Sequence, residues 1–161
     1  NHFNLDDIPE ELVLQKRKCY VNYFENDPTL SLVNGVKELI QFLYKQNLTL
    51  VLASSSAMVN INRVFSRFDL NQYFTAKISG ADLTASKPHP EIFEKAAILG
   101  CVSKEQCIVI EDSDNGIKAA NDAGIFVVGY ENPLVSDQTL KDANLIIRDY
   151  NILKKYMIDL K

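Results

Sequence analysis

Short apolar segments alternate with amphipathic segments from about residue 33 onward, and this alternation limits the possible folds more than any other feature of the sequence. Unbroken apolar runs of four to six residues are typical of strands that are covered on both faces of a sheet. Largely apolar segments of three to six residues lie at 48–53, 75–79, 107–110, 125–129 and 145–147, and the segment 75–79 is the weakest strand signal among them. Strands that alternate with helices predict an α/β fold, in which right-handed crossovers join a parallel sheet that has helices on both faces.

Helical spacing of apolar residues predicts helices between these strands and one helix before them. The first covers residues 6–25, with Pro9 near its start, and Asn26-Asp27-Pro28 ends it. The others are expected over residues 33–46, 57–67, 91–99 and 116–123 and from residue 150 onward. One boundary is suggested near residues 27–34, where the first helix gives way to the alternating region.

Composition favours a globular protein of one domain. The chain has 161 residues, of which 47% are apolar and 24% charged, and no apolar run reaches the length of a membrane span. The net charge of −4, without a large basic cluster, argues against a nucleic acid as partner. Cys19, Cys101 and Cys107 have no C-x-x-C spacing, which argues against a zinc site or a disulfide framework and fits a reducing cytoplasm. We expect neither a nucleic acid nor a membrane as partner.

Polar residues gather in three places at or near the ends of predicted strands. Ser54-Ser55-Ser56 follow the run 48–53, Ser86-Lys87-Pro88 lie in the loop after residues 75–79, and Glu111-Asp112 follow the run 107–110. Ser113, Asp114 and Asn115 then supply capping chemistry for the helix 116–123, which Gly124 ends. Because ligands of open α/β sheets bind outside the carboxyl ends of the strands, we expect these clusters to lie close together.

The residue types in these clusters suit a phosphate and a divalent cation. A serine hydroxyl and the amides of a helix N-terminus donate to phosphoryl oxygens, and a lysine ammonium supplies a point charge. Two carboxylates can hold Mg²⁺, which bridges protein and phosphate. Each cluster alone also fits an ordinary role, because a serine-rich turn can cap a helix, a loop lysine can be solvated and Lys87-Pro88-His89-Pro90 can be a stiff turn. Together they favour a binding site.

In this order, the residues resemble the haloacid dehalogenase superfamily of phosphohydrolases, in particular its branch of beta-phosphoglucomutases and sugar-phosphate phosphatases. The resemblance extends from about Val33 onward. It is carried by three motifs, Leu52-Ala53-Ser54-Ser55-Ser56, Ser86-Lys87-Pro88-His89-Pro90-Glu91-Ile92-Phe93 and Glu111-Asp112-Ser113-Asp114-Asn115-Gly116-Ile117, followed by Ala119-Ala120 and Ala123-Gly124.

The resemblance implies a Rossmann-like core over residues 31–161 and part of a helical cap over residues 1–30. It implies that Ser54 and Lys87 are catalytic and bind the transferring phosphoryl group, together with Ser55. It further implies that Asp112 ligates Mg²⁺, that Glu111 helps directly or through water, and that a cis peptide bond precedes Pro88.

One motif of the family is absent from the sequence. That motif is an apolar strand ending in Asp-x-Asp-x-Thr/Val, which carries the nucleophilic aspartate and the general acid/base. Asp6-Asp7 follow no apolar strand, Asp69 follows a helix and Asp82 lies in a loop. In the family this strand lies between those expected here at 48–53 and 107–110, and without it two apolar edges would face each other. We therefore expect an N-terminally incomplete core that lacks its first strand and nucleophile and is inactive alone, with the missing strand and half of the cap supplied by residues outside this sequence.

The activity implied by the resemblance is that of a Mg²⁺-dependent phosphatase, which acts on a small sugar phosphate through an aspartyl-phosphate intermediate. The alternative is a beta-phosphoglucomutase-type phosphomutase, which passes the phosphoryl group to another sugar hydroxyl. Mutases of this branch carry a Lys-Asn pair just after the serines, and Ala57-Met58 at that place favour the phosphatase. We expect a cytoplasmic monomer whose partner is a small phosphorylated metabolite, and the sequence leaves its identity open.

Two interpretations from other classes stay open. A non-catalytic relative could bind phosphometabolites or a protein partner, and an absent or replaced first-motif aspartate in the sequence upstream of Asn1 would support it. A response-regulator-like receiver also has acidic strand ends, but it fits the order of serine, lysine and acids less completely.

Overall fold

The computed structural model describes residues 8–159, with side chains up to residue 157. Two compact units make up the chain, residues 1–33 and 34–161. Their division falls within residues 27–34, where the sequence indicates a boundary. None of the helices within residues 8–159 combines the length and the apolarity needed to cross a membrane.

The first unit contains the helix α1 (Pro9–Asn26). Pro9 at the start of the helix has a φ suited to a first turn, and Glu10 and Glu11 place negative charge near the positive end of the helix dipole. The helix predicted over residues 6–25 is confirmed from Pro9 onward, whereas Asp6 and Asp7 lie outside the described residues. Beyond the helix, one carboxylate oxygen of Asp27 accepts hydrogen bonds from the Thr29 amide at 2.8 Å and the Thr29 hydroxyl at 2.6 Å.

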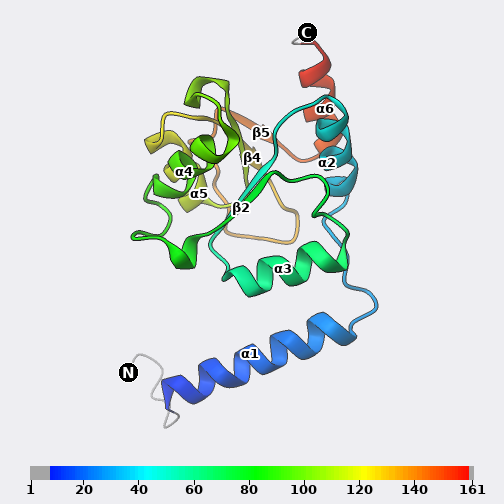
Figure 1. Ribbon diagram of the computed structural model, residues 1–161, viewed down its shortest axis with the longest axis vertical. Coiled ribbons are helices and arrows are strands. Elements are labelled where there is room, and N and C mark those ends of the chain that lie inside the picture. Colours follow the sequence, from blue (N-terminus) through cyan, green and yellow to red (C-terminus); the bar gives the residue numbers. More distant parts are fainter. Residues whose placement is uncertain (1–7, 160–161) are drawn as a thin grey trace. The chain divides into compact units, whose positions relative to one another are not determined.

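Parallel strands form two hydrogen-bonded sheets in the described part of the second unit (Figure 1). In the smaller sheet β1 (Val51–Ser54) pairs with β2 (Ala76–Ser79). In the other, β4 (Phe126–Tyr130) lies between β3 (Ile108–Glu111) and β5 (Leu145–Ile147). The strands appear where the apolar runs predict them, and the predicted parallel α/β fold is confirmed.

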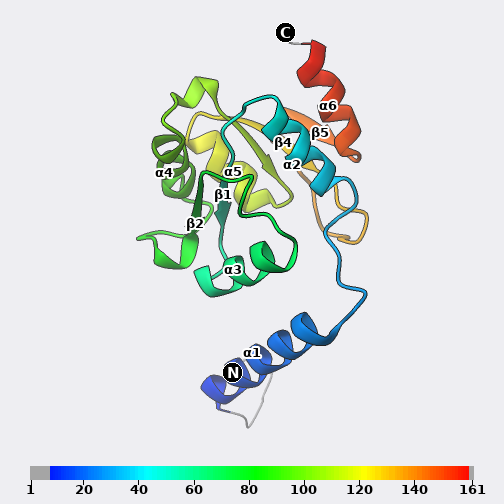
Figure 2. The ribbon, with the colours of Figure 1, turned by 45° about the vertical axis from the view of Figure 1, so that its right-hand side comes forward.

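Helices cover both faces of the larger sheet, as two neighbouring residues of β4 demonstrate. Val127 belongs to an apolar cluster with residues of α4 (Glu91–Gly100) and α5 (Asp114–Asp122), and Val128 to one with residues of α2 (Val36–Lys45) and α6 (Tyr150–Asp159). Successive side chains of a strand point to opposite faces, so the two clusters lie on opposite sides of the sheet. Figures 1 and 2 show the same arrangement, with α4 and α5 on one side and α2 and α6 on the other.

The remaining elements are short and lie near the smaller sheet or between α4 and β3. The helix α3 (Met58–Arg67) connects β1 to β2 and contacts β2. Two 3-10 turns, η1 (Gly80–Asp82) and η2 (Lys104–Gln106), follow β2 and α4.

Several elements begin or end a few residues from their predicted positions. β1 begins at Val51, where its pairing with β2 starts, and not at residue 48. α4 includes Gly100, the expected stop, as its last residue, and the C-cap that follows is Cys101, whose φ of +55° is left-handed. α5 begins at Asp114 rather than at residue 116, because Ser113 alone is the N-cap and accepts a hydrogen bond from the Gly116 amide.

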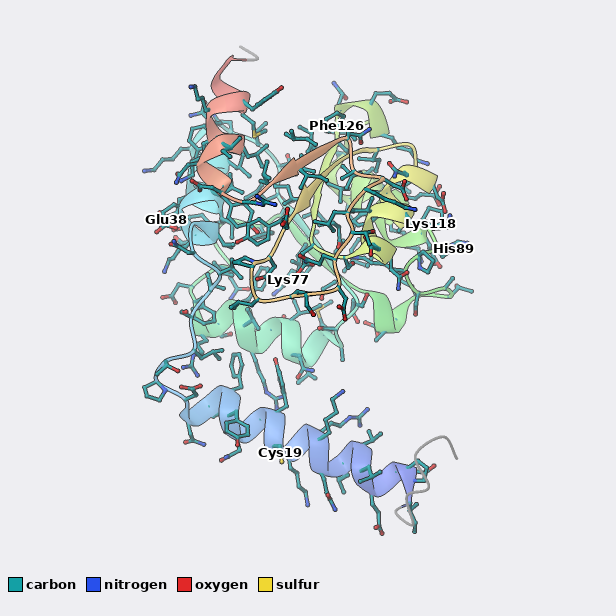
Figure 3. The ribbon with its side chains drawn as sticks, turned by 180° about the vertical axis from the view of Figure 1, so that it is seen from behind. Cys19, Glu38, Lys77, His89, Lys118 and Phe126 are labelled. Atoms are coloured by element: carbon teal, nitrogen blue, oxygen red, sulfur yellow. The ribbon has the colours of Figure 1, made fainter. Side chains whose placement is uncertain are left out.

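Each of β1 and β3 pairs on one side only within the described residues. Ile108 and Ile110 of β3 are 43% and 36% exposed, although Val109 between them is buried. Phe126, the register partner of Ile108 on β4, is also exposed (Figure 3). One face of β3 therefore keeps apolar side chains partly uncovered, next to a free hydrogen-bonding edge.

Candidate functional site

Lys87 joins the carboxyl ends of β1 and β3, which belong to different sheets. Its Nζ donates a hydrogen bond to the main-chain oxygen of Ala53 in β1 at 3.2 Å and forms an ion pair with the Glu111 carboxylate at the end of β3. It also lies 4.8 Å from the centre of the Phe93 ring, a cation–π contact. The structure thus brings the lysine, one of the two acids and the end of the serine-bearing strand together.

The Lys87–Glu111 pair is buried, with side chains 9% and 8% exposed. Charges removed from water need a partner and further hydrogen bonds, because their desolvation is costly. This position is inconsistent with a solvated loop lysine, the ordinary role that the sequence alone leaves open.

Glu111 lies against the N-terminus of α5. Its Oε2 accepts a hydrogen bond from the Ser113 hydroxyl at 3.0 Å, and the Ser113 oxygen in turn accepts one from the Gly116 amide at 3.1 Å. A Cβ at Gly116 would lie only 2.0 Å from Glu111 Oε2, so the close approach of carboxylate and helix requires glycine here. The positive end of the helix dipole favours the carboxylate in this place.

Ser54 is the last residue of β1, and Ser55 begins the turn towards α3. The Ser54 hydroxyl oxygen accepts a hydrogen bond from the Ser56 amide at 3.2 Å, which leaves its proton available to another acceptor. The N-cap of α3 is Ala57, and no side chain caps the helix. The serines therefore do not have the capping role that a serine-rich turn often has.

The loop that carries Lys87 is held by Glu91, in the first turn of α4. Glu91 Oε2 accepts a hydrogen bond from the Ala85 amide at 3.0 Å, and Oε1 pairs with Lys95 at 2.7 Å. The Lys95 side chain, followed by the Ala85 amide, lowers the pKa of the Glu91 carboxyl below its usual value. The peptide bond between Lys87 and Pro88 is cis, which confirms that prediction.

Asp112 follows Glu111 and is exposed, unlike its neighbour. Its main-chain oxygen accepts a hydrogen bond from the Gln138 side chain. Burial first, then the neighbouring Tyr130 and Asp112, raise the pKa of the Tyr150 phenol above its usual value. The Tyr130 and Tyr150 rings are stacked, with their centres 4.4 Å apart.

Asp114 and Gln138 were not among the candidates from the sequence. Asp114 accepts hydrogen bonds from the Leu140 amide at 2.8 Å and the Thr139 hydroxyl at 3.0 Å. These donors, the Leu140 amide foremost, lower the pKa of the Asp114 carboxyl. An acid in the first turn of a helix is a weak signal for such a role, and nothing in the sequence marks Gln138, which lies 26 residues from Asp112.

Asp112 and Glu111 supply carboxylate oxygens at the carboxyl edge of β3, the type of donor that Mg²⁺ prefers. No cluster of three or more His, Cys, Asp or Glu side chains suited to a metal occurs in the described part of the chain. Mg²⁺ is commonly held by one or two carboxylates, with waters and substrate phosphates completing its octahedron. The donors therefore fit Mg²⁺, with Asp112 the accessible carboxylate, because Glu111 already contacts Lys87 and Ser113.

Known proteins with a similar sequence include phosphomutases and phosphatases of sugar phosphates. "Beta-phosphoglucomutase" of Bacillus subtilis (strain 168) is 32% identical over 139 residues, which are 86% of this chain and 59% of that protein. "Hexitol phosphatase B" of Escherichia coli (strain K12) is 38% identical over 98 residues, 60% of this chain and 44% of that protein. The "phosphorylated carbohydrates phosphatase" of Thermotoga maritima is 26% identical over 144 residues, 89% of this chain and 64% of that protein.

A crystal structure of beta-phosphoglucomutase from Clostridium difficile superposes on this chain with a TM-score of 0.78 and 29% identity, covering 93% of this chain and 65% of that one. The chain thus spans less than two thirds of the length of each of these relatives. The haloacid dehalogenase-like hydrolase family model matches residues 4–130, most of the chain. This chain belongs to the haloacid dehalogenase-like hydrolase family, as its three motifs indicate.

Proposed function

We propose that this chain forms most of the catalytic core of a Mg²⁺-dependent phosphatase, which hydrolyses a small sugar phosphate through an aspartyl-phosphate intermediate. The observation that carries the proposal is the buried Lys87, held between the Ala53 carbonyl of β1 and the Glu111 carboxylate of β3. A buried ammonium at the edge where strands end can neutralise a phosphoryl group that lies beside it.

In the proposed reaction an aspartate oxygen attacks phosphorus while the bond to the sugar oxygen breaks, and a general acid protonates that oxygen. Water then hydrolyses the aspartyl phosphate and releases inorganic phosphate. Ser54 donates its hydroxyl proton to a phosphoryl oxygen, and Lys87 balances the charge on the equatorial oxygens. Asp112, with Glu111 beside it, would hold Mg²⁺, which would supply positive charge to neutralise part of the phosphate charge.

We further propose that the nucleophilic aspartate ends a strand between β1 and β3, contributed by residues outside this sequence. Two observations support this. β1 and β3 each have one unpaired edge in the described part of the chain, and Lys87 ties their carboxyl ends together. A strand in this place would pair with the free edge of β3 beside Ile108 and Ile110 and would end beside Lys87.

The phosphatase and the mutase differ in where the phosphoryl group goes. Ala57-Met58 after the serines favours the phosphatase, whereas relatives of both kinds are similar to the chain. The test gives the full-length protein Mg²⁺, beta-glucose 1-phosphate and a glucose bisphosphate activator, and measures glucose 6-phosphate and free phosphate. Release of free phosphate with no glucose 6-phosphate supports the phosphatase, and the reverse refutes it. A full-length protein without an aspartate at the end of the central strand would refute both and support a binding role.

A further inference from the structure

The loop between β4 and β5 is tied to the turn after β3 by the side chain of Gln138. Its Nε2 donates to the main-chain oxygen of Asp112 at 2.5 Å, and its Oε1 accepts from the Asn132 amide at 2.8 Å. Gln138 is half-buried, and the two ends of its side-chain amide join two segments of the chain. The contact fixes the peptide group that follows Asp112.

A second link holds the other side of the same turn. Asp114 accepts hydrogen bonds from the Leu140 amide and the Thr139 hydroxyl, so the loop contacts residues on both sides of Ser113. Leu140 is buried, at 2% exposure, and has a φ of +48°, a left-handed conformation that is uncommon for a bulky residue. The loop is therefore anchored in the core and holds its conformation against a local backbone cost.

The carboxylate of Asp112 is the group that would hold the divalent cation in the proposed function. Within the described residues no hydrogen bond reaches this carboxylate, and the residue is exposed. The direction of the side chain then depends on the peptide groups around Asp112, one of which Gln138 holds. Mg²⁺ requires nearly octahedral geometry, so the orientation of such a carboxylate affects how tightly the ion binds.

We infer that Gln138 is a positioning residue for Asp112, which it holds through the main-chain carbonyl in the orientation that binds the divalent cation. The inference rests on the proposed function, because it takes Asp112 as the metal ligand. It extends that function by assigning a role in metal affinity to a loop that lies outside all three motifs.

The test measures binding of Mg²⁺ alone, without substrate, to the full-length protein by titration calorimetry. Gln138→Met keeps the length of the side chain and removes both hydrogen bonds. We expect its Mg²⁺ dissociation constant to rise about tenfold, the size typical for loss of a group that supports a metal ligand. Its phosphatase rate should return to near the wild-type value when Mg²⁺ is raised above the new dissociation constant.

The matched control is Ser136→Ala, in the same loop, because the hydroxyl of Ser136 donates its hydrogen bond to the neighbouring Asp137 carboxylate and not to the turn after β3. Its Mg²⁺ affinity should equal that of the wild type. A folded Gln138→Met variant with wild-type Mg²⁺ affinity would overturn the inference. A wild-type protein that binds no Mg²⁺ would overturn the proposed function instead, so the two failures are distinct.

Gln138→Glu covers the case in which Gln138→Met does not fold. The glutamate can still accept the hydrogen bond of the Asn132 amide, and it loses only the donor to the Asp112 carbonyl. Its added negative charge alone would strengthen attraction of the cation. Weaker Mg²⁺ binding in Gln138→Glu therefore supports the positioning role, and equal or tighter binding contradicts it.

Discussion

Lys87 and Glu111 lie 24 residues apart in the sequence and form an ion pair whose side chains are both about nine-tenths buried. The pair connects the loop before α4 to the end of β3, and Lys87 extends the connection to β1 through the Ala53 carbonyl. Because β1 and β3 belong to separate sheets, Lys87 and Glu111 together link the two sheets of the second unit.

Removal of one charge of this pair should destabilise the protein strongly. Lys87→Met leaves the Glu111 carboxylate buried without its counter-ion, and we expect a loss of about 3 kcal/mol in the free energy of unfolding, measured by urea denaturation. The double variant Lys87→Met/Glu111→Gln removes both charges and should recover a large part of the loss.

The control for this prediction is the exposed pair Lys118–Asp122, whose side chains are 61% and 43% exposed and whose lysine lies on the surface (Figure 3). Lys118→Met should change the free energy of unfolding by less than about 0.5 kcal/mol. Equal effects of Lys87→Met and Lys118→Met would show that burial of the first pair has no energetic consequence.

A methyl group at Gly116 should displace the Glu111 carboxylate. In Gly116→Ala the new Cβ would lie 2.0 Å from Glu111 Oε2, far inside van der Waals contact. We expect a loss of about 2 kcal/mol in unfolding free energy, from overpacking. Gly100→Ala is the matched control, since its Cβ in α4 would meet Val102 at an ordinary 3.5 Å. It should leave stability unchanged or raise it by up to about 0.5 kcal/mol, and a similar loss in both variants would contradict the steric argument.

The positions of the strands could be predicted because strands of a parallel sheet are largely apolar. The run 107–110, for example, predicts β3, and the acids that follow it predict which edge of the sheet carries polar groups. The ends of elements were less accurate. Glycine is a residue type that often ends a helix, but the residue with the left-handed φ is Cys101 and not Gly100. Which of two neighbouring residues adopts this conformation depends on what packs against each of them.

The meeting of Lys87 with the end of β3 follows from the rule that parallel strands end at one edge. The contacts of Lys87 with the Ala53 carbonyl and the Phe93 ring do not follow from it, since they depend on how the loop turns. Gln138 and Asp114 were missed for a related reason. Loops have no periodic pattern, and a glutamine that supports a distant carbonyl has the same local sequence as one that is solvated.

The link between Asp114 and the loop should weaken in acid. Hydrogen bonds from the Leu140 amide and Thr139 lower the pKa of Asp114 in the folded state, below the value of about 3.9 expected when unfolded. A lowered pKa gives stability that is fully present above the unfolded pKa and is lost as pH falls through the folded pKa.

The measurement for Asp114 is the free energy of unfolding of the wild type and of Asp114→Asn, each from pH 7 down to pH 2.5. The wild type should be the more stable of the two above about pH 5, and the difference should shrink as the pH falls below about 4. Thr139→Val removes one of the donors and should give an intermediate pH dependence. A difference that stays constant over the whole range would contradict the assigned titration.

The hydroxyl of Ser79 is buried at the end of β2 and has no hydrogen-bond partner among the described residues. A buried polar group without a partner costs the folded state free energy, so its removal should be favourable. We expect Ser79→Ala to raise the free energy of unfolding by about 1 kcal/mol, measured by urea denaturation. A loss of stability would mean that the hydroxyl has a partner in solution.

Ser54 is the residue through which the proposed phosphoryl contact is most directly tested, because its hydroxyl proton is free to be donated while its oxygen accepts from the Ser56 amide. In the full-length protein, Ser54→Ala should lower kcat by about a hundredfold, the usual cost of losing one donor to a charged transition state. Ser56→Ala is the matched control, since only the main chain of Ser56 takes part in that hydrogen bond, and its kcat should stay within about twofold of the wild type. If Ser54→Ala and Ser56→Ala hydrolyse sugar phosphates equally well, Ser54 does not contact the transferring group. The position of the phosphate would then have to be assigned from Lys87 and the N-terminus of α5 alone, since both lie at the same edge of the strands.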